Sequence, residues 1–208
     1  YANETIAISD IIQGTLERRC GRESTLIFNG VKIHKKAKEH SYLDDINVRP
    51  NKYLLVVARF VPEKGLHILL DAYSKIDTDI KLVIAGDADH ETQYSRDLKS
   101  KAAKSSNVIL TGYIVGEDLH QLYSHAKLFV LPSFHEGLPI ALLEALSYGL
   151  RPLASDIPAN ERVPINKEDY FKVGSTSDLQ EKLTNFLTGN TEKNHETTYI
   201  KMAEKYYS

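Results

Sequence analysis

The sequence predicts an α/β domain in which a parallel sheet is sandwiched by helices. Short runs rich in β-branched residues alternate with segments of helical period, and this alternation is typical of a parallel sheet. Most of the short runs are apolar throughout, as expected for strands that helices cover on both faces. The expected strands are residues 25–28, 53–58, 81–85, 108–111, 128–131, 152–155 and 170–173.

Helical periodicity follows several of these strands. Leu66, Leu69, Leu70 and Tyr73 fall at i, i+3, i+4 and i+7. This spacing gives one apolar stripe that faces the sheet and a polar face toward water. Similar stripes are predicted in residues 118–125, 140–148 and 177–187.

Turn-forming residues follow the carboxyl ends of the strands. Because the carboxyl ends of parallel strands meet at one edge, we expect these loops to lie together beside helix N-termini, which bind anions. The loops, rich in Gly, Pro and short polar residues, are residues 59–65, 86–90, 112–118, 132–139 and 156–161. The sequence therefore predicts an anion-binding edge.

The expected domain organisation has three parts. Residues 1–22 are interpreted as the remnant of a preceding domain or linker, and residues 23–188 as the α/β domain. Residues 189–208 form a helical tail, in which 189–195 are turn-like and 197–207 resume a helical pattern. Because the chain starts at Tyr1 and its last helix has no cap, we expect both ends to continue in a longer protein.

Composition excludes several classes of protein. The 208 residues are 42% apolar and 26% charged, as in an ordinary globular domain, and the net charge of -2 argues against a nucleic-acid partner. The single cysteine, Cys20, excludes a disulfide within the sequence and a cysteine-based zinc cluster, which suits a reducing compartment. No apolar run reaches the roughly 18 residues of a spanning helix. We therefore expect a cytoplasmic protein.

Several familiar motifs are absent from the sequence. It contains no G-x-G pair, hence no dinucleotide fingerprint, and neither a P-loop nor a G-x-S-x-G elbow. Asp77 and Asp79 are interpreted as a solvated turn, and Asp87 and Asp89 as helix-capping carboxylates. The alternative is that either pair holds a cation against a diphosphate. The favoured interpretation predicts no metal.

Charged side chains gather in the loops at the predicted edge. Glu136 lies in the loop after residues 128–131, and Glu144 follows eight positions later on an otherwise apolar helix. A carboxylate on such a helix is costly to bury without a partner. Arg59 and Lys64 lie in the loop after residues 53–58, and two cations there can neutralise a diphosphate.

These segments resemble a known family. Five segments carry the resemblance: residues 57–65, 84–87, 110–113, 129–136 and 143–146. They are similar to the donor-binding domain of retaining GT-B glycosyltransferases of group 1, whose mark is a Glu-x7-Glu motif, met here by Glu136 and Glu144. The resemblance covers about residues 6–186. It implies a Rossmann-like parallel sheet sandwiched by helices, the C-terminal half of a GT-B fold.

The resemblance implies a role for each charged residue. Arg59 and Lys64 would hold the diphosphate of a nucleotide-sugar and stabilise the charge that develops as the glycosidic bond breaks. Glu136 would face the donor sugar, and Glu144 would accept hydrogen bonds from the ribose diol. These assignments make Arg59, Lys64 and Glu136 the expected catalytic residues.

Backbone groups complete the implied donor site. The start of the helix after Glu136 would meet sugar hydroxyls and phosphate oxygens, and the loop at residues 112–114 would line the base. The implied donor-binding residues besides Glu144 are Gly137, Leu138, Ile140, Ala141, Gly112, Tyr113 and Ile114. No metal and no cofactor beyond the nucleotide-sugar substrate are expected.

The implied function is sugar transfer from a nucleoside-diphosphate sugar to a sugar or lipid-linked acceptor, in bacterial surface polysaccharide or glycolipid synthesis. A preceding domain would bind the acceptor, so the 208-residue chain is expected to bind donor without catalysing transfer. Lys32, Lys35, Lys36 and Lys38 are interpreted as a solvated face, with peripheral contact at the inner face of a membrane as the alternative. The alternative functions are a GT-B nucleotide-sugar epimerase and a non-enzymatic nucleotide-binding domain.

Overall fold

A sheet of six parallel strands forms the centre of the structure, a computed structural model that describes residues 3–189 and 196–207. The strand order in these residues is β5-β4-β3-β6-β7-β8. The strands are β3 (Tyr53–Val57), β4 (Lys81–Ala85), β5 (Val108–Gly112), β6 (Leu128–Leu131), β7 (Pro152–Ser155) and β8 (Tyr170–Phe171). The predicted parallel α/β architecture is therefore confirmed.

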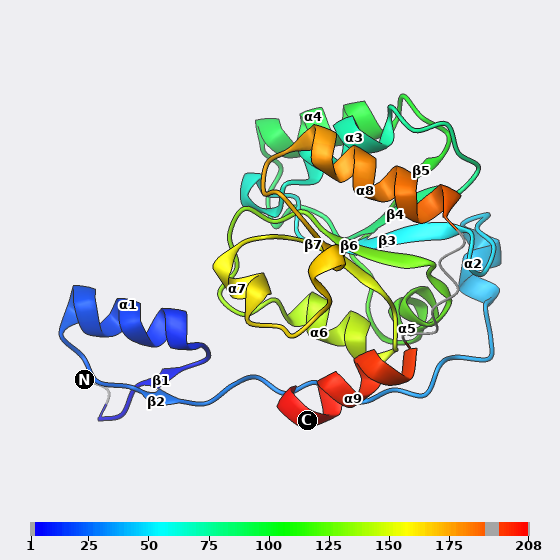
Figure 1. Cartoon of the computed structure of the whole chain (residues 1–208). Helices are drawn as coiled ribbons and strands as arrows, with labels where there is room; N and C mark the ends of the chain where they lie inside the picture. The colour runs from blue at the N-terminus through cyan, green and yellow to red at the C-terminus, as the bar shows by residue number, and fades with distance from the viewer. Residues whose placement is uncertain (1–2, 190–195, 208) are drawn as a thin grey trace.

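Helices cover both faces of the sheet (Figure 1). One face packs against α3 (Leu66–Tyr73), α4 (Gln93–Ala102) and α8 (Thr176–Thr188). The other packs against α2 (Ser41–Asp45), α5 (Gly116–His125), α6 (Ile140–Ser147) and α9 (Glu196–Tyr207). The apolar stripes predicted α3, α5, α6 and α8. The sequence analysis did not predict α4, whose narrow stripe of Tyr94, Leu98 and Ala102 lies in an otherwise polar segment.

The core consists of two apolar layers separated by the sheet. In β3, Leu54 and Val56 contribute to the layer beneath α3, whereas Tyr53 and Leu55 contribute to the layer beneath α5. All four side chains are fully buried. Because side chains alternate between the two faces, each strand supplies both layers, which is why these strands are mostly apolar.

One predicted strand has a different partner from the one expected. The sequence placed residues 25–28 in the central sheet, but β2 (Thr25–Leu26) pairs with β1 (Ile6–Ala7) in a separate two-stranded sheet. The Thr25 N–H donates to the Thr5 carbonyl at 2.8 Å, and the Ile27 N–H to the Ala7 carbonyl at 2.9 Å. The backbone N–H groups of residues 25 and 27 are therefore used in pairing with the segment around β1. The apolar run predicted a strand but did not identify the strand with which it pairs.

The N-terminal segment lies beside the main body (Figure 1). It comprises β1, β2 and α1 (Asp10–Cys20), and an extended stretch then leads to α2. Arg162, just after α7 (Pro158–Glu161), makes a 2.8 Å ion pair with Asp10 and so joins α1 to the body. The domain boundary between residues 22 and 23 stays a prediction.

The C-terminal helix α9 confirms the helical pattern expected there and packs on α6. The Tyr199 hydroxyl donates to Asp169 Oδ2 at 2.6 Å, and Arg151 pairs with Asp169 at 2.7 Å. Because Tyr199 and Asp169 are buried, this contact ties α9 to the sheet. The turn expected at residues 189–195 lies, apart from Gly189, outside the described residues.

The strand order identifies where a ligand fits. The chain winds outward from β3 through β4 and β5, then returns to β6 on the other side of β3 and winds the opposite way. In doubly wound sheets, ligands bind beyond the carboxyl ends of the strands at this reversal. The loops after β3 and β6 carry Arg59, Lys64 and Glu136, so the fold places these residues there.

None of the helices in the described residues has the length and apolar character that crossing a membrane requires.

Candidate functional site

The loops that follow β3 and β6 are in direct backbone contact. The Phe134 N–H donates to the Glu63 carbonyl at 2.8 Å. Gly65 adopts a φ of +64° and lies so close to Pro132 that a Cβ at residue 65 would be 2.0 Å from the Pro132 carbonyl oxygen. Only glycine fits this conformation and this approach, so Gly65 sets Lys64 against the loop that carries Glu136.

Lys64 and Glu136 form an ion pair that is largely shielded from water. Lys64 Nζ lies 2.7 Å from Glu136 Oε1, and their side chains are 20% and 8% exposed. The buried Ser133 hydroxyl donates to the same carboxylate oxygen at 2.7 Å. Ser155 in turn donates its hydroxyl to the Ser133 carbonyl at 2.5 Å. This chain of bonds holds the Glu136 carboxylate in place.

Arg59 is exposed and has a different partner. Its Nη1 lies 2.8 Å from Asp89 Oδ2, with 58% and 64% of the two side chains exposed. Because exposed ion pairs are screened by water, this pair contributes little to stability. It does hold the guanidinium beside the loop that follows β4.

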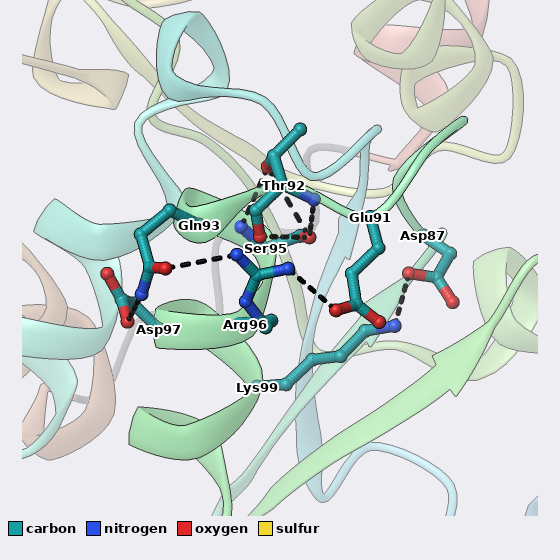
Figure 2. A network of polar contacts seen from close by, with 8 residues as sticks. All are labelled: Asp87, Glu91, Thr92, Gln93, Ser95, Arg96, Asp97 and Lys99. Atoms are coloured by element: carbon teal, nitrogen blue, oxygen red, sulfur yellow. Dashed lines mark hydrogen bonds and ion pairs between the residues drawn. The ribbon is translucent and has the colours of Figure 1, made fainter.

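Asp87 and Asp89 do not cap the next helix, which corrects the interpretation made from the sequence. The N-cap of α4 is Thr92, whose side chain and that of Ser95 form a reciprocal capping box (Figure 2). Asp87 instead pairs with Lys99 at 2.7 Å, and this bond is the main cause that lowers the pKa of the Asp87 carboxyl. The aspartates precede the helix by too many residues to reach its first N–H groups.

Ion pairs and amide contacts brace the β4–α4 loop (Figure 2). Arg96 pairs with Glu91 at 2.8 Å and donates to Gln93 at 3.0 Å. Gln93 also donates to Asp97 at 2.7 Å. Among the described residues, no cluster of three or more His, Cys, Asp or Glu side chains is arranged for a metal ion.

Arg59 and Lys64 line one cavity of about 570 Å³. Its other walls come from residues 86–89 after β4 and from Tyr113, Ile114 and Val115 after β5. Tyr113 is 80% exposed, so most of its ring is open to a ligand. Gly112 joins the two loops, since its carbonyl accepts a 2.8 Å hydrogen bond from the Gly86 N–H.

Glu144 lines a second cavity of about 500 Å³ that shares Leu119 with the first. The cavity lies between α5 and α6, with His34 of the extended stretch on its wall. The Tyr123 hydroxyl donates to Glu144 Oε2 at 3.0 Å. Burial raises the pKa of Glu144, and the hydrogen bond from Tyr123 opposes that shift.

The aromatic side chains around Glu144 were not predicted as site residues from the sequence. Tyr123 stacks on Tyr148 with ring centroids 5.2 Å apart, and His34 stacks on the other side of Tyr148 at 4.9 Å. His120 Nδ1 lies 2.8 Å from the Tyr148 hydroxyl oxygen. A tyrosine in an apolar helical stripe is ordinarily interpreted as a core residue. Only the packing of α5 against α6 shows that Tyr123 reaches Glu144.

The start of α6 lies further along the same edge. Gly137 and Leu138 line a third cavity, of about 290 Å³, facing α1. The Ile140 N–H donates to the Leu138 carbonyl at 2.9 Å, whereas no acceptor for the Ala141 N–H occurs in the described part of the chain. Of the predicted site residues, Arg59, Lys64, Tyr113 and Ile114 line the first cavity, Glu144 the second, and Gly137 and Leu138 the third. Gly112, Glu136, Ile140 and Ala141 are not among the lining residues of these three cavities.

This arrangement suits an extended anionic ligand. A lysine ammonium has three donors and an arginine guanidinium has five, so Lys64 and Arg59 keep donors for a second anion beside their carboxylate partners. In the adjoining cavity, a carboxylate with one bonded oxygen can accept hydroxyl groups. The geometry therefore fits a ligand with a diphosphate at one end and a diol nearby.

A doubly wound parallel sheet whose ligand-binding edge carries Arg59, Lys64 and Glu136 defines the class of this domain as an open α/β domain. The family model of glycosyl transferases group 1 matches residues 44–205, so the chain belongs to that family. The resemblance found from the sequence motifs is thereby confirmed.

Relatives and solved structures agree with this assignment. The serotype-specific mannosyltransferase WbdA of Escherichia coli is 30% identical over 163 residues, which are 75% of this chain and 20% of that protein. A GDP-mannose:cellobiosyl-diphosphopolyprenol alpha-mannosyltransferase of Xanthomonas oryzae pv. oryzae is 35% identical over 139 residues, 64% of this chain and 34% of that protein. The chain thus spans a fifth to a third of these relatives.

The crystal structure of Anabaena HepE in complex with UDP and glucose superimposes with a TM-score of 0.87 at 19% identity, covering 100% of this chain and 60% of that one. This match shows the fold. The Rossmann-like half of a GT-B fold expected from the sequence is confirmed.

Proposed function

We propose that this chain is the donor-binding part of a retaining glycosyltransferase that uses a nucleoside-diphosphate sugar. The observation that carries the proposal is the gathering of Arg59, Lys64 and Glu144 on two adjoining cavities at the reversal point of the sheet. Because the chain belongs to the group 1 glycosyl transferases, we assign these side chains to a sugar-transfer reaction.

The cations are assigned to the diphosphate. Lys64 has low exposure and therefore acts where water screens its charge less than in bulk solvent. Arg59 adds a second positive group on the same cavity. Negative charge grows on the diphosphate as the glycosidic bond breaks, and these groups stabilise it. Glu136 is assigned to the sugar side, where it also positions Lys64 through their 2.7 Å ion pair.

The remaining groups are assigned to the nucleoside and the sugar. Glu144 accepts hydrogen bonds from the ribose hydroxyls. Tyr113, Ile114 and the backbone of Gly112 line the binding site of the base. The α6 start, from Gly137 through Leu138 and Ile140 to Ala141, faces sugar hydroxyls and phosphate oxygens. The presence of UDP in the HepE structure and of GDP-mannose in the name of the Xanthomonas enzyme supports a donor of this class.

The acceptor is assigned to the rest of a longer protein. The mannosyltransferase names of the relatives support a sugar or lipid-linked acceptor in surface polysaccharide or glycolipid synthesis. The cytoplasmic location and a peripheral contact with the inner face of a membrane stay predictions, as does the absence of a metal.

The chain is expected to bind UDP or GDP equally well with and without a chelator, because cations and helix N-termini supply the positive potential.

Glu144→Gln is expected to weaken this binding by about 1–3 kcal/mol, the scale of a lost hydrogen bond to a charged group. Isothermal titration of both proteins with each nucleotide, in magnesium and in chelator, measures both effects.

Asp118→Asn is the matched control, since Asp118 is an exposed carboxylate on α5 that lines neither cavity. Its affinity should equal that of the unmodified chain. Binding that disappears in chelator would return Asp87 and Asp89 to consideration as metal ligands. Unchanged affinity in Glu144→Gln would contradict the ribose assignment.

The 208-residue chain is expected to show no sugar transfer above background, although it binds the nucleotide. Alignment of two reactants contributes several kcal/mol, about 7–11 kcal/mol at its upper end, and this chain carries only the donor side of the proposed site. Radiolabelled UDP-glucose and GDP-mannose, incubated with this chain and with the longer protein, measure transfer. Robust transfer by the chain alone would mean that it also binds the acceptor, and epimerised donor without acceptor would favour the epimerase alternative.

A further inference from the structure

Glu144 accepts a hydrogen bond from a residue on another helix. Tyr123 lies on α5 and Glu144 on α6, 21 positions apart. The Tyr123 hydroxyl oxygen is 3.0 Å from Glu144 Oε2 and 3.4 Å from the Ala141 carbonyl oxygen. Within the described residues, Oε1 has no corresponding donor, so one carboxylate oxygen is bonded and the other remains available.

The Tyr123 ring has little freedom to move away from this position. Its side chain is 2% exposed and packs between Tyr148, at a centroid distance of 5.2 Å, and Phe129, at 5.9 Å. Burial raises the pKa of Tyr123 well above 10, so its hydroxyl keeps its proton. The protonated hydroxyl therefore donates its hydrogen bond to the Glu144 carboxylate, and the packing of the ring fixes the position of the hydroxyl oxygen.

The other groups around Glu144 do not replace this donor. The Tyr148 hydroxyl on α6 lies 2.8 Å from His120 Nδ1 of α5. Glu117 on α5 adds a negative charge to the same cavity. His34, from the extended stretch, stacks on Tyr148, and burial is the main cause that lowers its pKa.

We propose that Tyr123 is a positioning residue for nucleotide binding: its hydroxyl holds Glu144 Oε2 so that Oε1 accepts the ribose hydroxyls. This inference rests on the proposed function, since it assigns a helper to the ribose-binding carboxylate. It also predicts pH dependence. Binding requires the ionised carboxylate and is lost as the pH falls through the pKa of Glu144. Removing the Tyr123 bond raises that pKa, so the loss begins at a higher pH.

The test compares UDP with 2′-deoxy-UDP, and GDP with 2′-deoxy-GDP, by titration between roughly pH 5 and pH 8. The unmodified chain is expected to prefer the ribonucleotide about 10–100-fold, the scale of one hydrogen bond to a charged group. Tyr123→Phe is expected to reduce that preference to about 2-fold and to move the acid loss of binding to higher pH.

Tyr73→Phe is the matched control. Its buried hydroxyl also donates one short hydrogen bond, to the Ile80 carbonyl, but on the opposite face of the sheet. It should leave the ribonucleotide preference and the pH profile unchanged. A double variant tests the route: in a Glu144→Gln background, Tyr123→Phe should have no further effect on the preference.

Each outcome is decisive. If the unmodified chain binds UDP or GDP and Tyr123→Phe keeps the same preference and the same pH profile, Tyr123 is only a core residue and the inference is wrong. A full additional loss of preference in the double variant would also contradict it. If the unmodified chain binds neither nucleotide, the proposed function itself fails, and the inference fails with it.

Discussion

Lys64→Ala is expected to lower turnover by the complete glycosyltransferase proposed above about 10²–10³-fold, the scale of removing one preorganised electrostatic group from a transition state. Lys64 lies beside Glu136 at low exposure, where its charge is weakly screened. Its effect should grow as the diphosphate departs, so turnover should fall more than donor affinity. Initial rates with UDP-glucose and GDP-mannose as donors separate kcat from KM.

The reference variants separate charge from structure. Lys99→Ala removes a partly exposed lysine that also pairs with a carboxylate, Asp87, but does not line the cavity. It should keep most of the activity. Lys64→Ala leaves the Glu136 carboxylate without its cation, so a double variant with Glu136→Gln should recover stability without recovering turnover. An effect confined to KM would make Lys64 a ground-state anchor.

Gly65→Ala is expected to destabilise the fold by about 2–5 kcal/mol. A left-handed conformation costs a non-glycine residue roughly 1–2 kcal/mol, and overpacking adds about 1–3 kcal/mol. The added Cβ would meet the Pro132 carbonyl oxygen at 2.0 Å, and backbone has little room to yield. Chemical denaturation followed by circular dichroism measures the change in the free energy of unfolding.

Gly116→Ala is the control for the backbone term. Gly116 has a φ of +65°, almost equal to that of Gly65, but a Cβ there would meet nothing within 4 Å. Its cost should therefore be the conformational part alone, about 1–2 kcal/mol. Equal destabilisation by the two substitutions would show that the loops after β3 and β6 separate easily.

Periodicity determined most of the fold from the sequence. The mainly apolar runs at residues 81–85, 128–131 and 152–155 coincide with β4, β6 and β7, because strands covered on both faces bury most of their side chains. The run at residues 25–28 is also apolar, but it pairs with β1. Strand pairing depends on which backbone donors and acceptors meet, and hydrophobicity does not encode that choice.

The sequence by itself determined the class of the protein and the edge at which Arg59, Lys64, Glu136 and Glu144 gather. The order of loops after parallel strands predicted an anion-binding edge, and the resemblance of five segments to group 1 glycosyltransferases indicated the class. Only the tertiary structure decided their partners: Glu136 for Lys64, Asp89 for Arg59 and Tyr123 for Glu144. These partners lie 72, 30 and 21 positions apart. A hydrogen bond requires placement within a few tenths of an ångström, and helix packing and loop paths set that placement only when the chain is folded.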